Sequence, residues 1–232
     1  MQTTIDVSHL TVRYGDRVAI RSLDLRVLAG EVVGVVGDNG AGKTSLLRTI
    51  AGLMREHAGT VAVEGHTRLR ERRESVAFAP DSGPFYPVPA RRIGAVLAET
   101  WPGFSADRFA ALVKRLDVPE NQPTSELSRG QMARLRLAIT LSRPGRILVL
   151  DEPLAGIDPH SRDRIAQVLA EHLADTDQTA LVSTHEVGYL EGVLERIVLL
   201  HRGDLAWDEA AEALRQRTGE SIETWLRRER LA

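Results

Sequence analysis

Residues 37–44 read Gly37-Asp38-Asn39-Gly40-Ala41-Gly42-Lys43-Thr44, and the rest of the predicted fold is built outward from them. They fit the phosphate-binding pattern G-x-x-x-x-G-K-[ST] at every required position. Residues 31–36 form a short apolar run typical of a buried strand, and residues 45–53 have a helical pattern. A glycine loop between a strand and a helix N-terminus turns successive backbone N–H groups toward one point, where they bind polyphosphate.

The side chains of this loop fit a polyphosphate bound together with a metal ion. The Lys43 ammonium is a point charge that reaches the β- and γ-phosphates, and the Thr44 hydroxyl holds a bridging Mg²⁺. The glycines let the backbone approach the ligand closely. The predicted phosphate-binding residues are Gly37, Asp38, Asn39, Gly40, Ala41, Gly42, Lys43, Thr44 and Ser45.

Length and composition predict one globular domain with a substantial core. The chain has 232 residues, of which 43% are hydrophobic and 27% are charged. Its net charge of −2 gives no basic surface of the kind that nucleic-acid-binding proteins carry, so no nucleic-acid partner is expected. The absence of cysteine excludes disulfides and thiolate metal sites and suits a reducing cytoplasm.

No segment has the sequence features of a signal peptide or of a membrane span. Residues 1–9 lack a charged-then-apolar pattern, and no apolar run approaches the ~18 residues that a span requires. Any membrane-embedded part is therefore expected on another chain.

The residues before the phosphate loop predict a small β-lobe. Residues 5–13 and 18–27 alternate apolar and polar side chains around a turn at residues 14–17, which indicates antiparallel strands. Tyr14 closes the first strand, and its ring either stacks on a purine base or packs against the sheet.

The residues after the loop predict alternating strands and helices. Strands are expected at 59–64 and 75–79, and the charged run between them, 66–74, is predicted to be a solvated hairpin. A loop with exposed apolar content is expected at 80–89. Helices are predicted at 90–100, 107–117, 129–141 and 159–174, and the chain closes with a hairpin, 195–201 and 204–207, and polar helical sequence to Ala232.

Two acidic residues, Asp151 and Glu152, end an apolar strand predicted at 146–150. Beside the 31–36 strand in a parallel sheet, Asp151 would reach the Mg²⁺ held by Thr44, and Glu152 would be the general base for an attacking water. Capping of the following helix is the alternative for either acid alone. His185 comes just after the end of a strand predicted at 179–183. A lone histidine is more often structural or on the surface than catalytic, but the strand ends of a parallel sheet converge on the ligand crevice, which makes this one a candidate.

Together with Leu127-Ser128-Arg129-Gly130-Gln131, this pattern resembles the ATP-binding cassette family, the nucleotide-binding subunits of ABC transporters. The resemblance covers nearly the whole chain and rests on five motifs in order. They are the Walker A motif at Gly37 to Thr44, the signature at Leu127 to Gln131, the Walker B motif with its catalytic glutamate at Ile147 to Glu152, the D-loop at Ala155 to Asp158, and the switch histidine at His185. Tyr14 stands where the family has its adenine-stacking aromatic residue.

The resemblance implies an α/β fold, with a RecA-like P-loop NTPase core, a small antiparallel β-lobe and an inserted α-helical lobe. Residues 1–232 are expected to form a single ABC ATPase domain. Within it, the core and β-lobe correspond approximately to 1–80 and 144–232, and the helical lobe to 81–143.

The family also implies ATP and Mg²⁺ as cofactors and a site shared by two cassettes, identical or different. ATP would lie between the phosphate loop of one cassette and the signature of the other, where the binding residues are Ser128, Gly130 and Gln131. The catalytic residues carried over are Glu152, His185 and Lys43. The metal ligands carried over are Thr44, Asp151 and Asp81.

The chain departs from the family pattern in three places. Asp81 stands where glutamine is usual; a carboxylate still takes a metal or water contact, but it adds negative charge beside the phosphates. Acidic residues there resemble exporter-type (ABC-2-like) cassettes, which favours export. Arg129 replaces the first signature glycine and either reaches nucleotide across the dimer or faces solvent, the latter being favoured. Residues 86–92 also differ from the usual sequence.

The leading functional hypothesis is an ATP-hydrolysing subunit that couples Mg-ATP-driven dimerisation to transport by separate transmembrane permease subunits. Such a subunit is cytoplasmic and peripheral on the cytoplasmic face of the membrane, and the exposed Phe85 and Tyr86 favour docking near residues 81–93. One alternative is a soluble mechanical ATPase built on the same cassette. Another is a regulator that senses nucleotide without hydrolysis, against which Glu152 and His185 both argue.

Overall fold

A computed structural model describes residues 2–83 and 85–231; Met1 and Ala232, the ends of the predicted domain, and Pro84 of the predicted loop lie outside these residues. Its larger sheet has the order β5-β6-β7-β3-β8-β9, parallel from β5 to β8, with β9 antiparallel at one edge. The strands are β3 (Val32–Gly37), β5 (Val76–Ala79), β6 (Ile147–Asp151), β7 (Thr179–Ser183), β8 (Arg196–His201) and β9 (Asp204–Ala210).

The central strands are apolar along their whole length because both faces of the sheet are covered. Every residue of β3, β6 and β7 is buried, as is usual for parallel strands between two layers. This burial explains why the sequence shows continuous apolar runs there, and it confirms the predicted strands at 31–36, 146–150 and 179–183. The prediction that the 146–150 strand lies beside the 31–36 strand is wrong, because β7 lies between β6 and β3.

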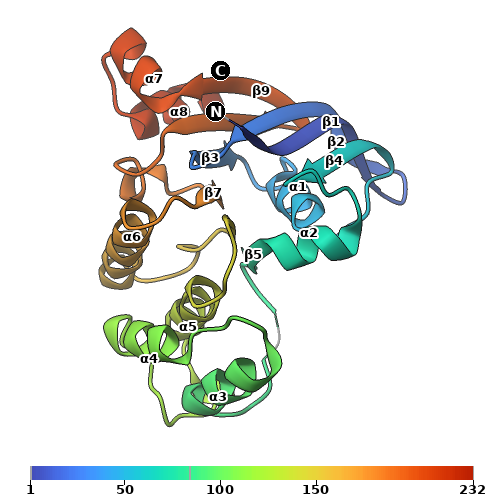
Figure 1. Cartoon of the computed structure of the whole chain (residues 1–232). Coiled ribbons are helices and arrows are strands. Elements are labelled where there is room, and N and C mark those ends of the chain that lie inside the picture. The colour runs from blue at the N-terminus through green and yellow to red at the C-terminus, as the bar shows by residue number, and fades with distance from the viewer. Residues whose placement is uncertain (1, 84, 232) are drawn as a thin grey trace.

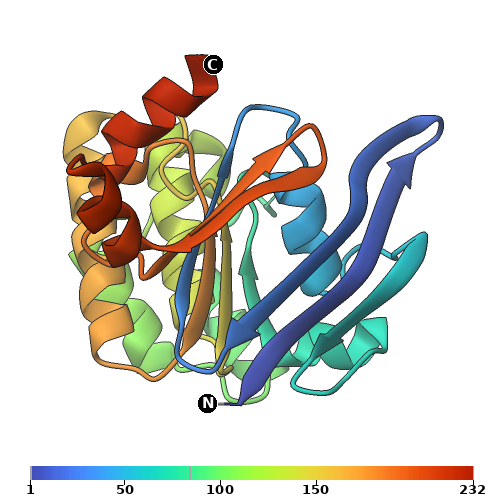
Figure 2. The same ribbon diagram turned by 90° about the horizontal axis from the view of Figure 1, so that it is seen from above.

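A second, three-stranded antiparallel sheet forms the β-lobe, with the order β2-β1-β4. Its strands are β1 (Thr3–Tyr14), β2 (Arg17–Leu28) and β4 (Ala58–Val63). Figure 2 shows α1 (Lys43–Ile50) lying between this sheet and the larger one. Leu46, Leu47 and Ile50 of α1 join a core cluster with residues of both sheets, so the helix that begins at the phosphate loop is fixed from two sides.

Three helices inserted between β5 and β6 form a helical lobe below the larger sheet (Figure 1). They are α3 (Ala90–Thr100), α4 (Ala106–Arg115) and α5 (Arg129–Leu141), and the 3-10 turn η1 (Thr124–Glu126) precedes α5. After β6 in the sequence come α6 (Pro159–Ala174), η2 (Val187–Tyr189), α7 (Ala211–Thr218) and α8 (Ile222–Leu231). The predicted fold class, with a parallel core, an antiparallel β-lobe and an inserted helical lobe, is confirmed.

The predicted hairpin at 66–74 is wrong, because this run contains the helix α2 (Leu69–Ser75). Its Arg72 is fully buried, donating from Nη1 to the Thr49 carbonyl at 2.9 Å and from Nη2 to Glu56 Oε2 at 2.9 Å. The guanidinium therefore pairs with the last turn of α1 and with a carboxylate. A charged run that looks solvated in the sequence thus contributes one arginine to the interior.

We expect Glu56→Ala to lower the free energy of unfolding by about 2 kcal/mol, because it leaves a buried guanidinium without its charged acceptor. Urea unfolding measures the difference. The matched control is Glu74→Ala, which removes the carboxylate of an exposed pair with Arg70 and should have a far smaller effect. Equal effects of the two substitutions would show that the Arg72–Glu56 pair does not stabilise the fold.

Candidate active site

The carboxyl ends of the parallel strands meet at a cavity of about 350 Å³. The phosphate loop follows β3, Asp151 ends β6, and His185 comes two residues after β7. The cavity is lined by Tyr14, Arg17, Ala19, Asp38, Asn39, Gly40, Gly42, Lys43, Thr44, Ser45, Asp81 and Glu152. Most of the predicted phosphate-binding residues are therefore on its wall.

The loop backbone requires glycine where it passes other main-chain segments. Gly42 has φ 111°, and a Cβ there would lie 2.5 Å from the Ala19 carbonyl oxygen; at Gly37 it would lie 2.3 Å from the Leu200 carbonyl oxygen. Within the described residues, no side chain caps the N-terminus of α1 at Gly42. The first N–H groups of this helix are therefore open to an anion in the cavity.

Lys43 is 6% exposed and lies folded back onto its own loop. Its Nζ donates to the Gly37 carbonyl at 2.7 Å and to the Asp38 carbonyl at 3.3 Å, and lies 3.1 Å from Glu152 Oε1. The ammonium is thus neutralised within the protein by the carboxylate that the sequence predicts as general base.

Asp151 has one oxygen that is well bonded and one that is not. Oδ1 accepts hydrogen bonds from Thr44 Oγ1 at 3.1 Å and from Ser183 Oγ at 2.8 Å, whereas Oδ2 is buried with no hydrogen-bond partner among the described residues. Burial raises the pKa of Asp151, and the two hydroxyl donors oppose that rise. A carboxylate oxygen without a donor, beside a hydroxyl, fits a Mg²⁺ ligand pair.

Glu152 lies between Lys43 and His185. Its Oε2 accepts from the His185 backbone N–H at 3.2 Å and lies 2.8 Å from His185 Nδ1. Its own N–H is held by the hydroxyl and carbonyl of Ser183, and its φ of 48° belongs to the left-handed region. A non-glycine residue in this conformation is a strained position of the kind that clusters at functional sites.

Tyr14 and Asp81 also line this cavity. Tyr14 is half exposed, and its hydroxyl lies 3.3 Å from Ser45 Oγ at the start of α1. Asp81 follows β5, and its carbonyl accepts from Arg136 Nη1 of α5 at 3.1 Å. Burial lowers the pKa of Arg136, and the Asp81 charge opposes that shift. Arg136 therefore connects the helical lobe to the segment that carries Asp81.

The signature lies at the N-terminus of α5, and its Ser128, Gly130 and Gln131 do not line this cavity. Leu127 and Arg129 line a neighbouring cavity together with Glu152. Ser128 Oγ accepts from the Gln131 N–H at 3.2 Å, and Gln131 Oε1 accepts from the Ser128 N–H at 2.8 Å, which forms a capping box. Arg129 is exposed, as favoured, but its guanidinium also packs on the D-loop, because a Cβ at Gly156 would lie 2.5 Å from Arg129 Cζ. Within one chain, Ser128, Gly130 and Gln131 do not meet the phosphate loop.

Sequence reasoning missed Arg17, Arg136 and the pair Arg162–Glu186. Arg17 lines the cavity and comes within 3.1 Å of a Cβ built at Gly40. Glu186 follows His185 directly and pairs with Arg162 at 2.5 Å. Within the single sequence, only the position of Glu186 beside His185 signals any of these residues.

A glycine phosphate loop at the carboxyl edge of a parallel sheet, with an acid pair at the end of a nearby strand, defines a P-loop nucleoside triphosphatase. A sequence profile described as "ABC transporter" matches residues 20–155, and the chain belongs to this family. It is an ABC ATPase, the ATP-binding subunit of a transporter.

The named relatives include both transport directions. The chain is 33% identical over 219 residues to the Nod factor export ATP-binding protein I of Burkholderia lata, covering 90% of this chain and 72% of that protein. It is 29% identical over 235 residues to the phosphonates import ATP-binding protein PhnC of Wolinella succinogenes, covering 92% and 86%. Its fold is similar to that of a dimeric ATP-binding cassette in a post-hydrolysis state with ADP and Pi, with TM-score 0.79, 21% identity, and 89% and 98% coverage.

We expect Asp151→Asn to weaken ATP binding in the presence of Mg²⁺ by about tenfold and to leave metal-free binding nearly unchanged, because the amide removes the anionic Oδ2. Titration of a fluorescent ATP analogue in the presence of Mg²⁺ or of EDTA measures the metal-dependent and the metal-free affinity separately. Asp175→Asn, at the exposed end of α6, is the matched control. If Mg²⁺ strengthens ATP binding to Asp151→Asn as much as to the wild type, this carboxylate is not a metal ligand.

Proposed function

We propose that this chain hydrolyses Mg-ATP in a dimer with a second cassette and thereby drives transport, in the export direction, by separate transmembrane subunits. It would work as a single domain, peripheral on the cytoplasmic face of the membrane. The observation that carries the proposal is the contact of Lys43, Glu152 and His185 beside the open N-terminus of α1. This arrangement provides a phosphate cradle, a base and an imidazole at one cavity.

Binding of ATP in the cradle would change the partners of Lys43. The polyphosphate carries more negative charge than the single carboxylate that now pairs with Nζ, so the ammonium would move to the phosphates. Glu152 keeps its contact with His185 and becomes free to take a proton from a water molecule. Thr44 and Asp151 would hold Mg²⁺, which supplies charge compensation at the phosphate oxygens, and Asp81 would contact the metal or its water shell.

The second cassette would complete the site. Ser128, Gly130 and Gln131 lie at a helix N-terminus away from the phosphate loop of their own chain, and such a terminus favours an anion. We propose that they meet the nucleotide held by the other cassette. The similarity in fold to a cassette dimer supports this arrangement.

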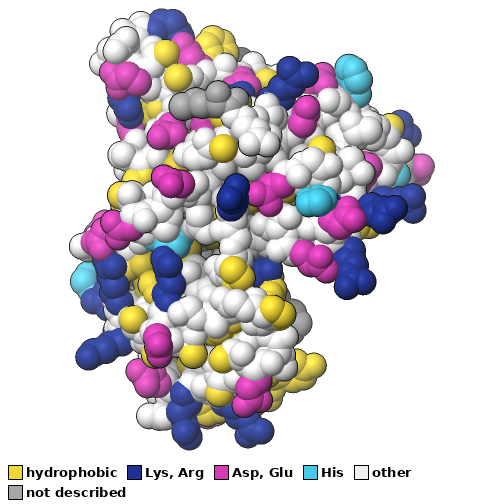
Figure 3. Space-filling view, viewed as in Figure 1, with side chains coloured by type: hydrophobic (Ala, Val, Ile, Leu, Met, Phe, Trp, Pro, Cys, Tyr) yellow, Lys and Arg dark blue, Asp and Glu magenta, His cyan; other side chains and the backbone are white. Residues whose placement is uncertain are grey.

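Docking on membrane subunits would use the loop between β5 and α3. Tyr86 in this loop is 85% exposed, whereas the prediction that Phe85 is exposed is wrong, because its ring packs partly buried against the core. Figure 3 shows further hydrophobic side chains over the surface of the helical lobe, in the lower half of the view. No helix in the described ranges is long and apolar enough to cross a bilayer. The preference for export rests on Asp81 at the usual glutamine position.

We expect Glu152→Gln to lower steady-state ATP turnover by at least about a hundredfold while ATP binding is kept, because the amide preserves the side-chain volume but accepts no proton. Phosphate release and analogue binding are measured on the same preparation. Light scattering with Mg-ATP should then show a trapped dimer. Glu74→Gln, which changes an exposed carboxylate of α2, is the control. Wild-type turnover in Glu152→Gln would exclude Glu152 as the base.

We expect Tyr86→Ser to weaken association with co-expressed transmembrane subunits by about tenfold, as for an exposed aromatic side chain at an interface. This association is measured by co-purification from detergent-solubilised membranes, quantified against protein concentration. Leu53→Ser, which changes an exposed apolar side chain just after α1, is the control. The docking proposal fails if the wild-type chain does not co-purify with those subunits at all.

A further inference from the structure

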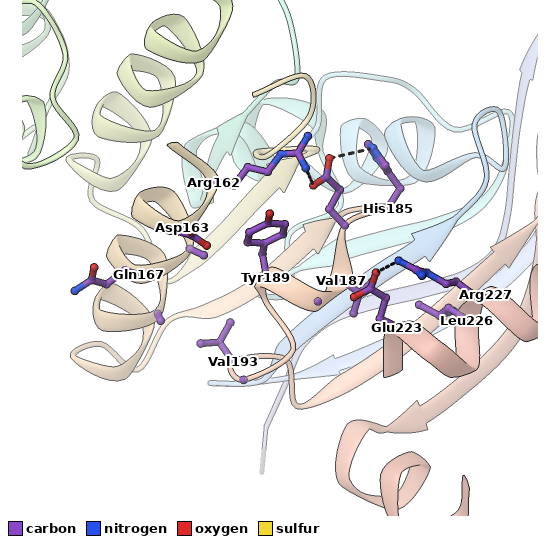
Figure 4. Close-up of a pocket in the computed structure, with 15 residues that line it drawn as sticks. Arg162, Asp163, Gln167, His185, Val187, Tyr189, Val193, Glu223, Leu226 and Arg227 are labelled. Carbon is purple, nitrogen blue, oxygen red and sulfur yellow. Dashed lines mark hydrogen bonds and ion pairs between the residues drawn. The ribbon is translucent and has the colours of Figure 1, made fainter. Parts of the chain in front are cut away.

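A second cavity, of about 1050 Å³, lies beside the candidate active site. Its walls come from α6, from the segment that follows β7, and from α8, and Figure 4 shows the side chains that line it. His185 lies at its rim, so the imidazole belongs to this cavity as well as to the contact with Glu152. The residues that line this cavity beside the imidazole can therefore affect its orientation.

An ion pair on this cavity wall joins α6 to the residue after His185. Arg162 Nη1 lies 2.5 Å from Glu186 Oε2, and the two side chains are only 23% and 14% exposed. The Arg162 guanidinium also lies 5.7 Å from the centroid of the Tyr189 ring. Because both charged groups are largely removed from water, the position of the carboxylate depends on that of the guanidinium, and the reverse is also true.

The same carboxylate contacts the imidazole. Glu186 Oε1 lies 3.6 Å from His185 Nε2, whereas Nδ1 of the same ring lies 2.8 Å from Glu152 Oε2. In Figure 4, dashed lines start from Arg162 and from His185, the two residues that pair with Glu186. Each ring nitrogen thus faces a carboxylate, Glu152 at hydrogen-bond distance and Glu186 at a longer one, so rotation of the imidazole away from Glu152 changes its position against Glu186 as well.

Arg162 owes its position to the D-loop. It lies in the first turn of α6, where its N–H donates to the Asp158 carbonyl at 3.0 Å, and Asp158 Oδ1 caps the helix by accepting from the Ser161 N–H at 2.9 Å. A displacement of residues 155–158 would therefore move Arg162, and with it the carboxylate that faces the imidazole.

We infer that Arg162 and Glu186 are positioning residues for His185: the guanidinium fixes the carboxylate, and the carboxylate fixes the imidazole against Glu152. Arg162 also neutralises Glu186, so that it adds no free negative charge beside the phosphates. The inference rests on the proposed function of His185 in ATP hydrolysis. It adds a contact path within one chain from the D-loop to the catalytic imidazole.

Arg162→Met and Glu186→Gln test this inference through kcat and KM. Each is expected to lower kcat for ATP by about tenfold, with KM within about twofold of wild type, because the ring loses its fixed position while the phosphate cradle is intact. Arg162→Lys keeps the charge and should restore most of kcat. Arg227→Met is the matched control, since Arg227 lines the same cavity and pairs with Glu223.

The decisive comparison repeats both substitutions in a His185→Ala background, with residual hydrolysis measured in single-turnover assays. If the pair acts through the imidazole, neither change lowers the rate further there. An equal loss with and without His185 would overturn the inference, as would an unchanged kcat in the single variants. If Arg162→Met does not fold, as judged by thermal unfolding, the isosteric Glu186→Gln decides alone. An unchanged kcat in His185→Ala itself would instead refute the proposed role of His185.

Discussion

The buried ammonium of Lys43 must be compensated inside the protein, and the arrangement of the site follows from this requirement. Two loop carbonyls and the Glu152 carboxylate provide the compensation. The carboxylate is itself fixed by His185, and the backbone of Glu152 is fixed by its N–H, which donates to Ser183. In the proposed mechanism, a polyphosphate that takes over Lys43 also releases the base, so ligand binding and activation of Glu152 are one event.

The register of the larger sheet brings Asp151, Ser183 and the phosphate loop together and leaves them little freedom to move. Asp151 of β6 lies opposite Ser183 of β7, and Ser183 in turn lies opposite Val35 of β3, the strand that leads into the phosphate loop. The Ser183 hydroxyl donates to Asp151 and also holds the Glu152 N–H. Since α1 is packed between two sheets, Thr44 at its start cannot move away from Asp151 without disturbing the core.

Local sequence patterns predicted the helices whose bounds depend on residues close to them in the chain. The helices at 90–100, 129–141 and 159–174 have the predicted bounds, because their apolar periodicity and their flanking residues are local features. The hairpin at 66–74 was wrong because the burial of Arg72 depends on Thr49 and Glu56, which are distant in sequence. The contact of Arg129 with Gly156 and the pair Arg162–Glu186 were missed for the same reason.

These missed contacts together join the motifs within one chain. Arg129, in the signature, packs on Gly156 of the D-loop; the D-loop ends at Asp158, which caps α6; and Arg162 in the first turn of α6 holds Glu186 against His185. Each step is a direct contact between residues of different elements. A cassette that meets its partner at the signature therefore has a continuous set of contacts from that surface to its own imidazole. Coupling along it requires that the D-loop have two arrangements, since a rigid path transmits no change.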